Sequence, residues 1–137
     1  MSMVSGGCLC GRIRYTATAA PAFTGICHCR DCQRATGSAF GTVVAFPREA
    51  VTILGDLRHY QGAGDSGRSI TRGFCPNCGS SLTVEVTTTP ELLLLAAGTL
   101  DDPAVVHPTA EIFCDSAQPW VQLRGERRRF PRQATRR

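Results

Sequence analysis

Three cysteines lie close together in the segment Cys27-His28-Cys29-Arg30-Asp31-Cys32, where their spacing is C-x-C-x-x-C. A short loop with this spacing can direct all three sulfurs at one soft cation, and the thiolate is the form of cysteine that binds metal. Zinc takes four protein ligands at a structural site, whereas a catalytic zinc keeps three protein ligands and an open position. The segment therefore predicts a metal site that lacks one protein ligand.

Two further cysteine pairs can supply a complete site elsewhere. Cys8 and Cys10 form a C-x-C pair with glycines on both sides, and Cys75 and Cys78 form a C-x-x-C pair followed by a glycine. The second pair has the form of a zinc knuckle, in which a tight turn directs two sulfurs to the same side. Because four sulfurs make the closed arrangement of a structural zinc, these pairs predict such a site, called here the four-cysteine group. The remaining clustered cysteines form the three-cysteine group: Cys27, Cys29 and Cys32.

Several side chains beside the three-cysteine group are candidates for its chemistry. His28 is a candidate proton shuttle, with the alternative that a residue between two ligands simply points outward. Arg30 and Arg34 are candidates for binding the carboxylate of a peptide-like thiol, because a guanidinium can bind a carboxylate through two parallel hydrogen bonds. Their alternative is a place on the solvated surface. A further alternative makes this site structural as well, with Cys114 or His28 as its fourth ligand.

The positive charge of the chain is confined to its C-terminal end. The 137 residues include 15 arginines, no lysine and 11 acidic residues, which gives a net charge of +4. Residues 1–123 hold eight of the arginines and ten of the acidic residues, whereas residues 124–137 hold seven arginines and one glutamate. We therefore expect one domain over residues 1–123 and a mobile tail over residues 124–137. The negative charge of the domain argues against nucleic-acid binding.

Cysteine usage and hydropathy bear on the cellular compartment. The eight cysteines are mostly clustered and no secretory signal pattern precedes them, so we expect reduced, metal-binding thiols rather than disulfides. The longest apolar run, residues 92–97, is far shorter than the ~20 residues that span a membrane. These features predict a cytoplasmic protein without a membrane partner.

Short strands must position the cysteines. Apolar alternation and β-branched or aromatic content predict strands at residues 12–16, 40–46, 51–54, 58–60, 68–74, 81–86 and 92–97. Residues 33–36 suggest a single helical turn, and residues 17–26 indicate a connection. Trp120 is expected to pack in the core and Cys114 to be a buried free thiol. The pattern favours an all-β architecture.

Three segments resemble the glutathione-dependent formaldehyde-activating enzyme family, which also includes centromere-protein-V-like proteins. They are residues 7–11, 27–40 and 74–79, and the likeness extends over residues 5–123. The resemblance implies a zinc-pinned β-tent of the Mss4-like type, with several short antiparallel sheets and at most short helical turns. It also implies a structural zinc at the four-cysteine group and a second, catalytic zinc at the three-cysteine group. Leu9 and Glu111 depart from the pattern by standing where histidine is expected, and Cys114 stands where an apolar residue is usual.

The chemistry expected of the second zinc follows from its ligands. Three thiolates give the site a net negative charge, so activation of water is not its natural task, whereas a thiol is deprotonated when it coordinates. The expected function is therefore that of a zinc-dependent carbon–sulfur lyase acting on a thiol adduct of a small aldehyde, of the S-hydroxymethylglutathione type. The expected partners are glutathione or another small thiol and a small aldehyde such as formaldehyde, with two zinc ions per chain.

Two other functions compete with this prediction. The first is a non-catalytic, zinc-stabilised binding or scaffold domain, in which both zinc ions only hold the fold. The second is a thiol redox protein, which is weaker because metal-bound cysteines are protected from disulfide cycling. Exchangeable zinc coordination together with turnover distinguishes the enzyme from a scaffold.

Overall fold

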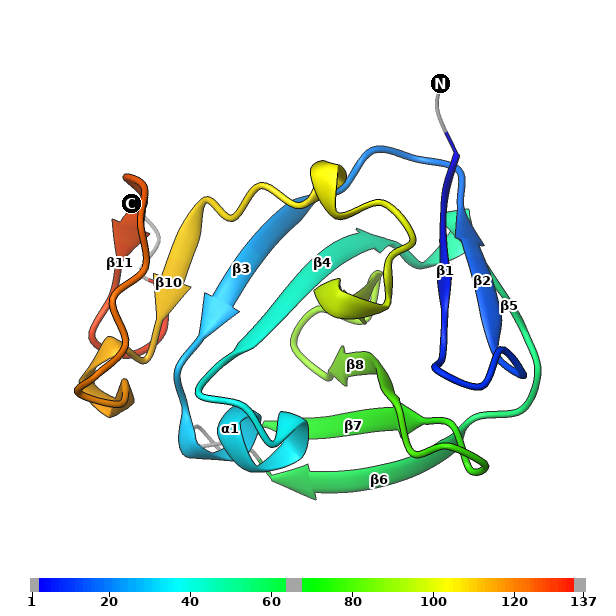
Figure 1. Cartoon of the computed structure of the whole chain (residues 1–137), viewed down its shortest axis with the longest axis horizontal. Coiled ribbons are helices and arrows are strands. Elements are labelled where there is room, and N and C mark those ends of the chain that lie inside the picture. Colours follow the sequence, from blue (N-terminus) through cyan, green and yellow to red (C-terminus); the bar gives the residue numbers. More distant parts are fainter. Residues whose placement is uncertain (1–2, 64–67, 135–137) are drawn as a thin grey trace.

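Two β-sheets form the framework of the molecule (Figure 1) in the computed structural model, which describes residues 3–63 and 68–134. The smaller sheet contains β1 (Val4–Gly7), β2 (Arg14–Ala17) and β5 (Val51–Leu54), in the order β1-β2-β5. The larger sheet contains β3 (Phe23–Cys27), β4 (Gly41–Pro47), β6 (Arg58–Ala63), β7 (Ser69–Phe74), β8 (Ser81–Val86), β9 (Leu92–Ala96), β10 (Ala110–Ile112) and β11 (Arg128–Arg129). Its strands follow the order β11-β10-β3-β4-β9-β8-β7-β6. The predicted all-β architecture is confirmed.

Helical structure in the described residues is short. The only α-helix among them is α1 (Arg30–Thr36), and the 3-10 helices are η1 (Arg48–Ala50), η2 (Ala97–Thr99), η3 (Pro103–Val105) and η4 (Cys114–Ser116). The helix α1 begins three residues before the predicted turn, because the Cys29 sulfur caps its N-terminus by accepting a hydrogen bond from the Cys32 N–H. It ends at Gly37, whose φ of 68° is the left-handed conformation that glycine adopts readily. No described helix has the length and apolar character needed to cross a membrane.

The strand β3 occupies a segment that the sequence predicts as part of a connection. The segment includes Gly25 and shows no alternation of apolar residues long enough to predict a strand. In the structure it pairs antiparallel with β4 on one side and parallel with β10 on the other. Thr24 and Ile26 are buried between these partners. The strands β1, β10 and β11 were likewise not predicted, because neighbours remote in sequence supply the hydrogen bonds that make them strands. The pairing of β10 with β3 matters for function, since it brings the chain after residue 110 against the three-cysteine group.

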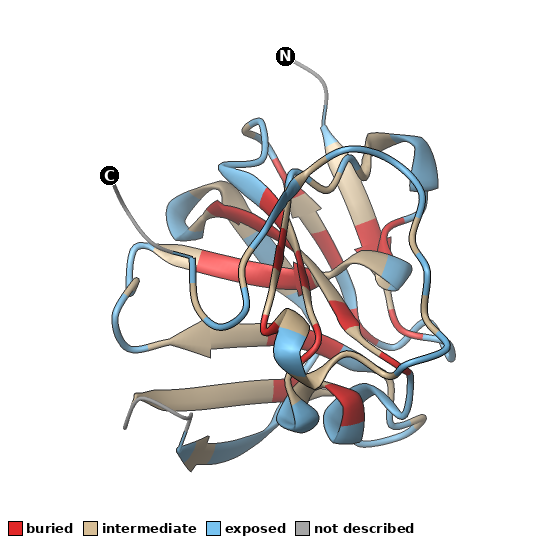
Figure 2. Cartoon of the chain, turned by 90° about the vertical axis from the view of Figure 1, so that its left-hand side faces the viewer, coloured by how far each residue is buried: buried red, intermediate tan, exposed pale blue. Residues whose placement is uncertain are grey.

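The core lies inside the curved sheets (Figure 2), where the buried positions lie mainly on the inner strands, whereas most loops and the outer strands β6 and β11 are exposed. Its largest fully buried side chains include Tyr15 on β2, Phe46 on β4 and Leu82 on β8. The expectation for Trp120 is wrong, because its side chain is 72% exposed. Its indole N–H donates to the Oε1 atom of Gln118 at 2.7 Å, so its polar partner lies on the surface segment rather than in the core.

The arginine-rich end of the chain lies against the domain. The strand β11 pairs in parallel with β10, and the Phe130 N–H donates to the Glu111 carbonyl oxygen at 2.9 Å. Residues 135–137, the last of the predicted tail, lie outside the described residues, as do residues 1–2 and 64–67. The domain boundary at residue 123 and the mobility of the tail stay predictions.

Replacement of Gly6 by alanine tests the close packing of β1 against β2 and η2. A Cβ atom at Gly6 would lie 2.3 Å from the Thr99 carbonyl oxygen and 2.3 Å from the hydroxyl of the buried Tyr15. We expect Gly6→Ala to lower the free energy of unfolding by about 1–3 kcal/mol, the usual cost of overpacking. Denaturant titration of the variant and of the parent chain measures the loss. Gly98→Ala is the control, because a Cβ there meets nothing within 4 Å, and equal midpoints for the two variants would contradict the packing.

Candidate metal centres

The four-cysteine group joins the smaller sheet to the larger one. Cys8 and Cys10 follow β1, whereas Cys75 and Cys78 follow β7, and all four sulfurs lie within 4.8 Å of one another. The Cys8 and Cys10 sulfurs are 3.6 Å apart, and the Cys10 and Cys75 sulfurs are 3.7 Å apart. Tetrahedral zinc with ordinary Zn–S bonds separates its sulfurs by about 3.8 Å. These residues therefore fit a zinc ion with no further ligand.

Backbone hydrogen bonds shape the four-cysteine group around its sulfurs. The Gly79 N–H donates to the Cys75 carbonyl oxygen at 2.8 Å, and the φ of 79° at Gly79 closes the knuckle turn. The Ile13 N–H donates to the Cys8 sulfur at 3.2 Å. At Cys78 a hydrogen bond from the Ser80 hydroxyl is the main cause that lowers the pKa of the thiol, to about 5. Such donors favour the thiolate form that a metal needs.

The three-cysteine group lies where β3 runs into α1. Cys27 is the last residue of β3, Cys29 caps α1 and Cys32 lies in its first turn, and their three sulfurs lie within 4.8 Å of one another. Hydrogen bonds from the Cys27 and Cys32 thiols, followed by the Cys32 N–H and the charge of Arg72, lower the pKa of Cys29 to about 2. The same sharing of protons raises the pKa of Cys27. These contacts favour the thiolate form at Cys29, and the three sulfurs lie close enough together to fit three corners of a zinc site.

Arg72 adds a positive charge beside the three-cysteine group that the sequence analysis missed. It lies on β7, and its Nη2 atom is 3.9 Å from the Cys32 sulfur. The two residues are 40 positions apart in the chain, so no local pattern reveals the contact. The only local signal was a charged residue in the middle of a predicted strand. Arg72 partly balances the negative charge that three thiolates would bring.

The two predicted substrate-binding arginines lie on the surface of α1. Arg30 and Arg34 are both exposed, and the Arg30 guanidinium donates to the Oε1 atom of Gln33. Gln33 itself is buried, and its amide donates to the carbonyl oxygens of His28 at 2.7 Å and of Ser116 at 3.0 Å. Gln33 therefore ties the helix to the segment after β10, with the two arginines on the outside.

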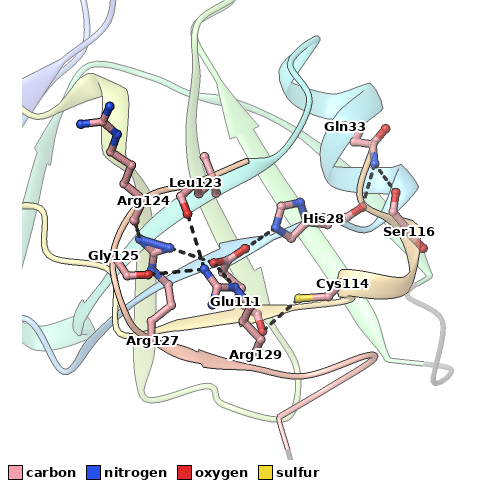
Figure 3. A network of polar contacts seen from close by, with 10 residues as sticks. All are labelled: His28, Gln33, Glu111, Cys114, Ser116, Leu123, Arg124, Gly125, Arg127 and Arg129. Atoms are coloured by element: carbon pink, nitrogen blue, oxygen red, sulfur yellow. Dashed lines mark hydrogen bonds and ion pairs between the residues drawn. The ribbon is translucent and has the colours of Figure 1, made fainter. Parts of the chain in front are cut away.

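His28 points into the protein, so the outward-pointing alternative is wrong. The side chain is only 2% exposed, and its Nε2 atom lies 2.8 Å from the Oε1 atom of Glu111 (Figure 3). The parallel pairing of β10 with β3 places Glu111 there, and the His28 N–H donates to the Ile112 carbonyl oxygen. Arg127 and Arg129 contact the other carboxylate oxygen of Glu111. Glu111 and these tail arginines are further residues that the sequence did not assign to the site.

The protonation of this pair follows from its surroundings. Burial alone would raise the pKa of Glu111, but hydrogen bonds from His28 and Arg127 and the charges of both arginines outweigh it and lower the pKa. The carboxylate is therefore ionised, and His28 donates its Nε2 proton to it. The Nδ1 atom of His28 is buried without a hydrogen-bond partner among the residues that the structure describes.

The structure supplies no fourth cysteine to the three-cysteine group within the described ranges. The Cys114 sulfur instead lies within 4.8 Å of a ring nitrogen of His28 and a carboxylate oxygen of Glu111. It is 3.7 Å from the Glu111 carbonyl oxygen. Cys114 is half-buried rather than fully buried. Two guanidinium groups already satisfy the carboxylate of Glu111, so this cluster is better suited to hydrogen bonding than to a metal ion.

Comparison with known proteins assigns the family. The model of the family described as glutathione-dependent formaldehyde-activating enzyme matches residues 3–116. The chain belongs to this family. The matched part of the formaldehyde-activating family includes both cysteine groups and Glu111, and it ends before the arginine-rich tail begins.

A solved structure with the same fold is among those that match this member of the formaldehyde-activating family. It is the crystal structure of a Rhodobacter sphaeroides protein, structural-genomics target RhR83, with a TM-score of 0.58 and 20% identity. The alignment covers 73% of this chain and 92% of that chain. At this identity the likeness concerns the fold alone. No curated protein matches the chain.

Proposed function

We propose that this protein is a zinc-dependent carbon–sulfur lyase that forms or cleaves a thiol adduct of a small aldehyde. The observation that carries the proposal is the three-cysteine group itself, whose sulfurs converge without a fourth cysteine ligand in the described residues. Membership of the formaldehyde-activating family supports glutathione as the thiol and formaldehyde as the aldehyde. A cytoplasmic location, where glutathione is the main reduced thiol, is part of the same proposal.

The two cysteine groups take different roles in this proposal. The four-cysteine group holds a structural zinc that ties the smaller sheet to β7 and β8. The three-cysteine group holds a second zinc, which when bound would favour the thiolate form of an incoming thiol at its open position. Arg72 lowers the electrostatic cost of gathering several thiolates at one place.

The reaction itself balances without an oxidant or reductant. The thiolate sulfur attacks the carbonyl carbon of the aldehyde and forms the carbon–sulfur bond, while the carbonyl π pair moves to oxygen. That oxygen takes up the proton released by the thiol, and the reverse sequence cleaves the adduct. Arg30 and Arg34 are proposed to bind carboxylates of glutathione, since both residues are exposed on α1, next to the three-cysteine group. His28 is a candidate proton carrier, but its burial against Glu111 favours a positioning role.

The decisive experiment measures zinc per chain together with turnover of glutathione and formaldehyde. We expect two zinc ions per chain, consumption of both substrates, and an exchangeable ligand at one zinc by X-ray absorption when glutathione is added. Four protein ligands at both zinc ions and no turnover would instead identify a scaffold domain.

Loss of the Arg72 charge is expected to weaken the second metal site. Arg72→Met retains a long unbranched side chain but removes the positive charge beside Cys32. A hydrogen bond to a charged group contributes about 1.5 kcal/mol. We therefore expect about tenfold weaker binding of one of the two zinc ions, measured by competition with a chelator. Arg58→Met is the matched control, because Arg58 is exposed on the neighbouring strand β6. Equal zinc affinities in the two variants would remove Arg72 from the site.

A further inference from the structure

Glu111 carries a buried charge that the family-matched part of the chain does not balance on its own. The residue is 4% exposed, and one carboxylate oxygen accepts the hydrogen bond from His28. Its other oxygen accepts from the Nη1 atom of Arg127 at 2.8 Å and from the Nε atom of Arg129 at 3.0 Å. A buried carboxylate is strongly destabilising unless it is paired, so the two arginines are needed where they lie.

The arginines that bind Glu111 are held in place by the tail itself. The Arg127 side chain is only 9% exposed, and its second amino group donates to the Arg124 carbonyl oxygen. The Arg129 guanidinium also reaches the carbonyl oxygens of Leu123 and Gly125, at 3.5 and 3.4 Å (Figure 3). This geometry differs from that of a solvated run of charges, because the guanidinium groups are fixed between a carboxylate and backbone carbonyls.

Main-chain hydrogen bonds secure the same segment. Five backbone hydrogen bonds of 2.8 to 3.2 Å join the tail to residues 109–115. In two of them a tail N–H donates: Arg128 N to Thr109 O and Phe130 N to Glu111 O. In the other three a tail carbonyl oxygen accepts: from Phe113 N to Arg132 O, from Cys114 N to Phe130 O, and from Asp115 N to Pro131 O. The tail is thus an added edge of the larger sheet, next to the strand that carries Glu111.

His28 connects this network to the proposed metal ligands. It lies in the chain between Cys27 and Cys29, and its backbone is held at both ends, by the Ile112 carbonyl oxygen and by the Gln33 amide. With the ring also bound to Glu111, the loop has little freedom to change the direction of either sulfur. The position of this ring therefore bears directly on the geometry of the three-cysteine group.

We propose that the arginine-rich tail is a working part of the three-cysteine site, in which Arg127 and Arg129 hold Glu111 and Glu111 fixes His28 between two metal ligands. Glu111 and the two arginines are positioning residues, because they act through His28 and reach no sulfur of that group. This inference rests on the proposed function only in assuming that the three-cysteine group binds zinc. It assigns a role to a segment that lies beyond the family match at residues 3–116.

Arg127→Met tests the proposal, with Arg128→Met as its matched control. Both variants remove one tail arginine, but the Arg128 side chain is exposed and lies over the Phe130 ring at 5.1 Å, with no contact to Glu111 in the described structure. We expect Arg127→Met to bind the second metal about 10–100-fold more weakly, the usual effect of losing a residue that orients a ligand, while the first metal is unaffected. Arg128→Met should bind both metals as the parent chain does.

The readout is metal affinity rather than turnover. Stepwise Co²⁺ binding, followed by the sulfur-to-metal charge-transfer band in competition with a chelator, resolves the two sites. Thermal unfolding of the zinc-loaded variants is recorded in parallel. A lower melting temperature for Arg127→Met with unchanged affinity at the second site would show a purely structural tail and overturn the proposal.

A double substitution covers the case in which Arg127→Met folds poorly. Glu111→Gln removes the buried charge, so Arg127→Met in a Glu111→Gln background leaves no uncompensated carboxylate. We expect the effect of Arg127→Met on the second metal to be several-fold smaller in that background. Equal effects in the two backgrounds would refute coupling through Glu111. A parent chain that binds one metal only would instead refute the proposed function.

Discussion

Replacement of Cys75 by serine is expected to leave the chain unfolded. Cys75 is fully buried and contributes one of the four sulfurs that join the smaller sheet to the larger one. A structural zinc contributes about 10–16 kcal/mol of apparent binding free energy, and a domain of this kind has a net stability of about 5–15 kcal/mol. We expect the variant to lose the structural zinc, and with it a binding free energy as large as the net stability of the domain. Circular dichroism and zinc content of the purified variant measure the outcome.

The control for this prediction is Cys114→Ser. Cys114 lies outside both cysteine groups that are proposed to bind zinc, so the variant should keep two zinc ions and the parent fold. A chelator strong enough to remove both zinc ions should unfold the parent chain and the control alike. A folded Cys75→Ser variant with the zinc content of the parent chain would rule out a structural zinc at the four-cysteine group.

Replacement of Cys29 by serine is expected to abolish turnover while the fold remains intact. Serine is a good N-cap, so its hydroxyl can accept the Cys32 N–H that the Cys29 sulfur accepts now, and α1 keeps its start. The variant loses the thiol with the lowest pKa of the three-cysteine group and with it the second zinc. We expect one zinc per chain and no turnover of glutathione with formaldehyde above background.

Three measurements together decide the outcome for Cys29→Ser. They are the zinc content, the far-ultraviolet circular dichroism and the rate of adduct formation, each compared with Cys114→Ser. Unchanged turnover with one zinc per chain would remove the three-cysteine group from the reaction. Unfolding of Cys29→Ser would favour the alternative in which both sites are structural.

The two cysteine groups are expected to affect different properties of the protein. The four-cysteine group joins strands of both sheets, so its loss acts on the whole domain, whereas the three-cysteine group lies at one junction between β3 and α1. The tail acts on that junction alone through Glu111 and His28. Stability and metal affinity at the second site should therefore separate in the variants.

Local patterns in the sequence were sufficient for much of the framework. The strands at residues 51–54 and 81–86 have the predicted bounds, because β-branched and alternating apolar residues specify an extended, half-buried chain. The partition of seven cysteines into groups of four and three also follows from spacing alone, since C-x-C and C-x-x-C turns direct neighbouring sulfurs to one side. The strands and the turn within each cysteine pair depend on residues that are close in the chain, whereas the meeting of the two pairs joins positions 65 residues apart.

Only the tertiary structure decided what surrounds the three-cysteine group. His28 and Glu111 are 83 residues apart, and they meet because β10 pairs in parallel with β3. Arg72 reaches Cys32 from another strand, and the tail reaches Glu111 through an added edge strand. Long-range strand pairing leaves no periodic signal in either partner, and a buried charge looks like a surface charge until its partners are in place. The sequence by itself determined how the clustered cysteines group, and the fold determined which charged side chains lie beside them.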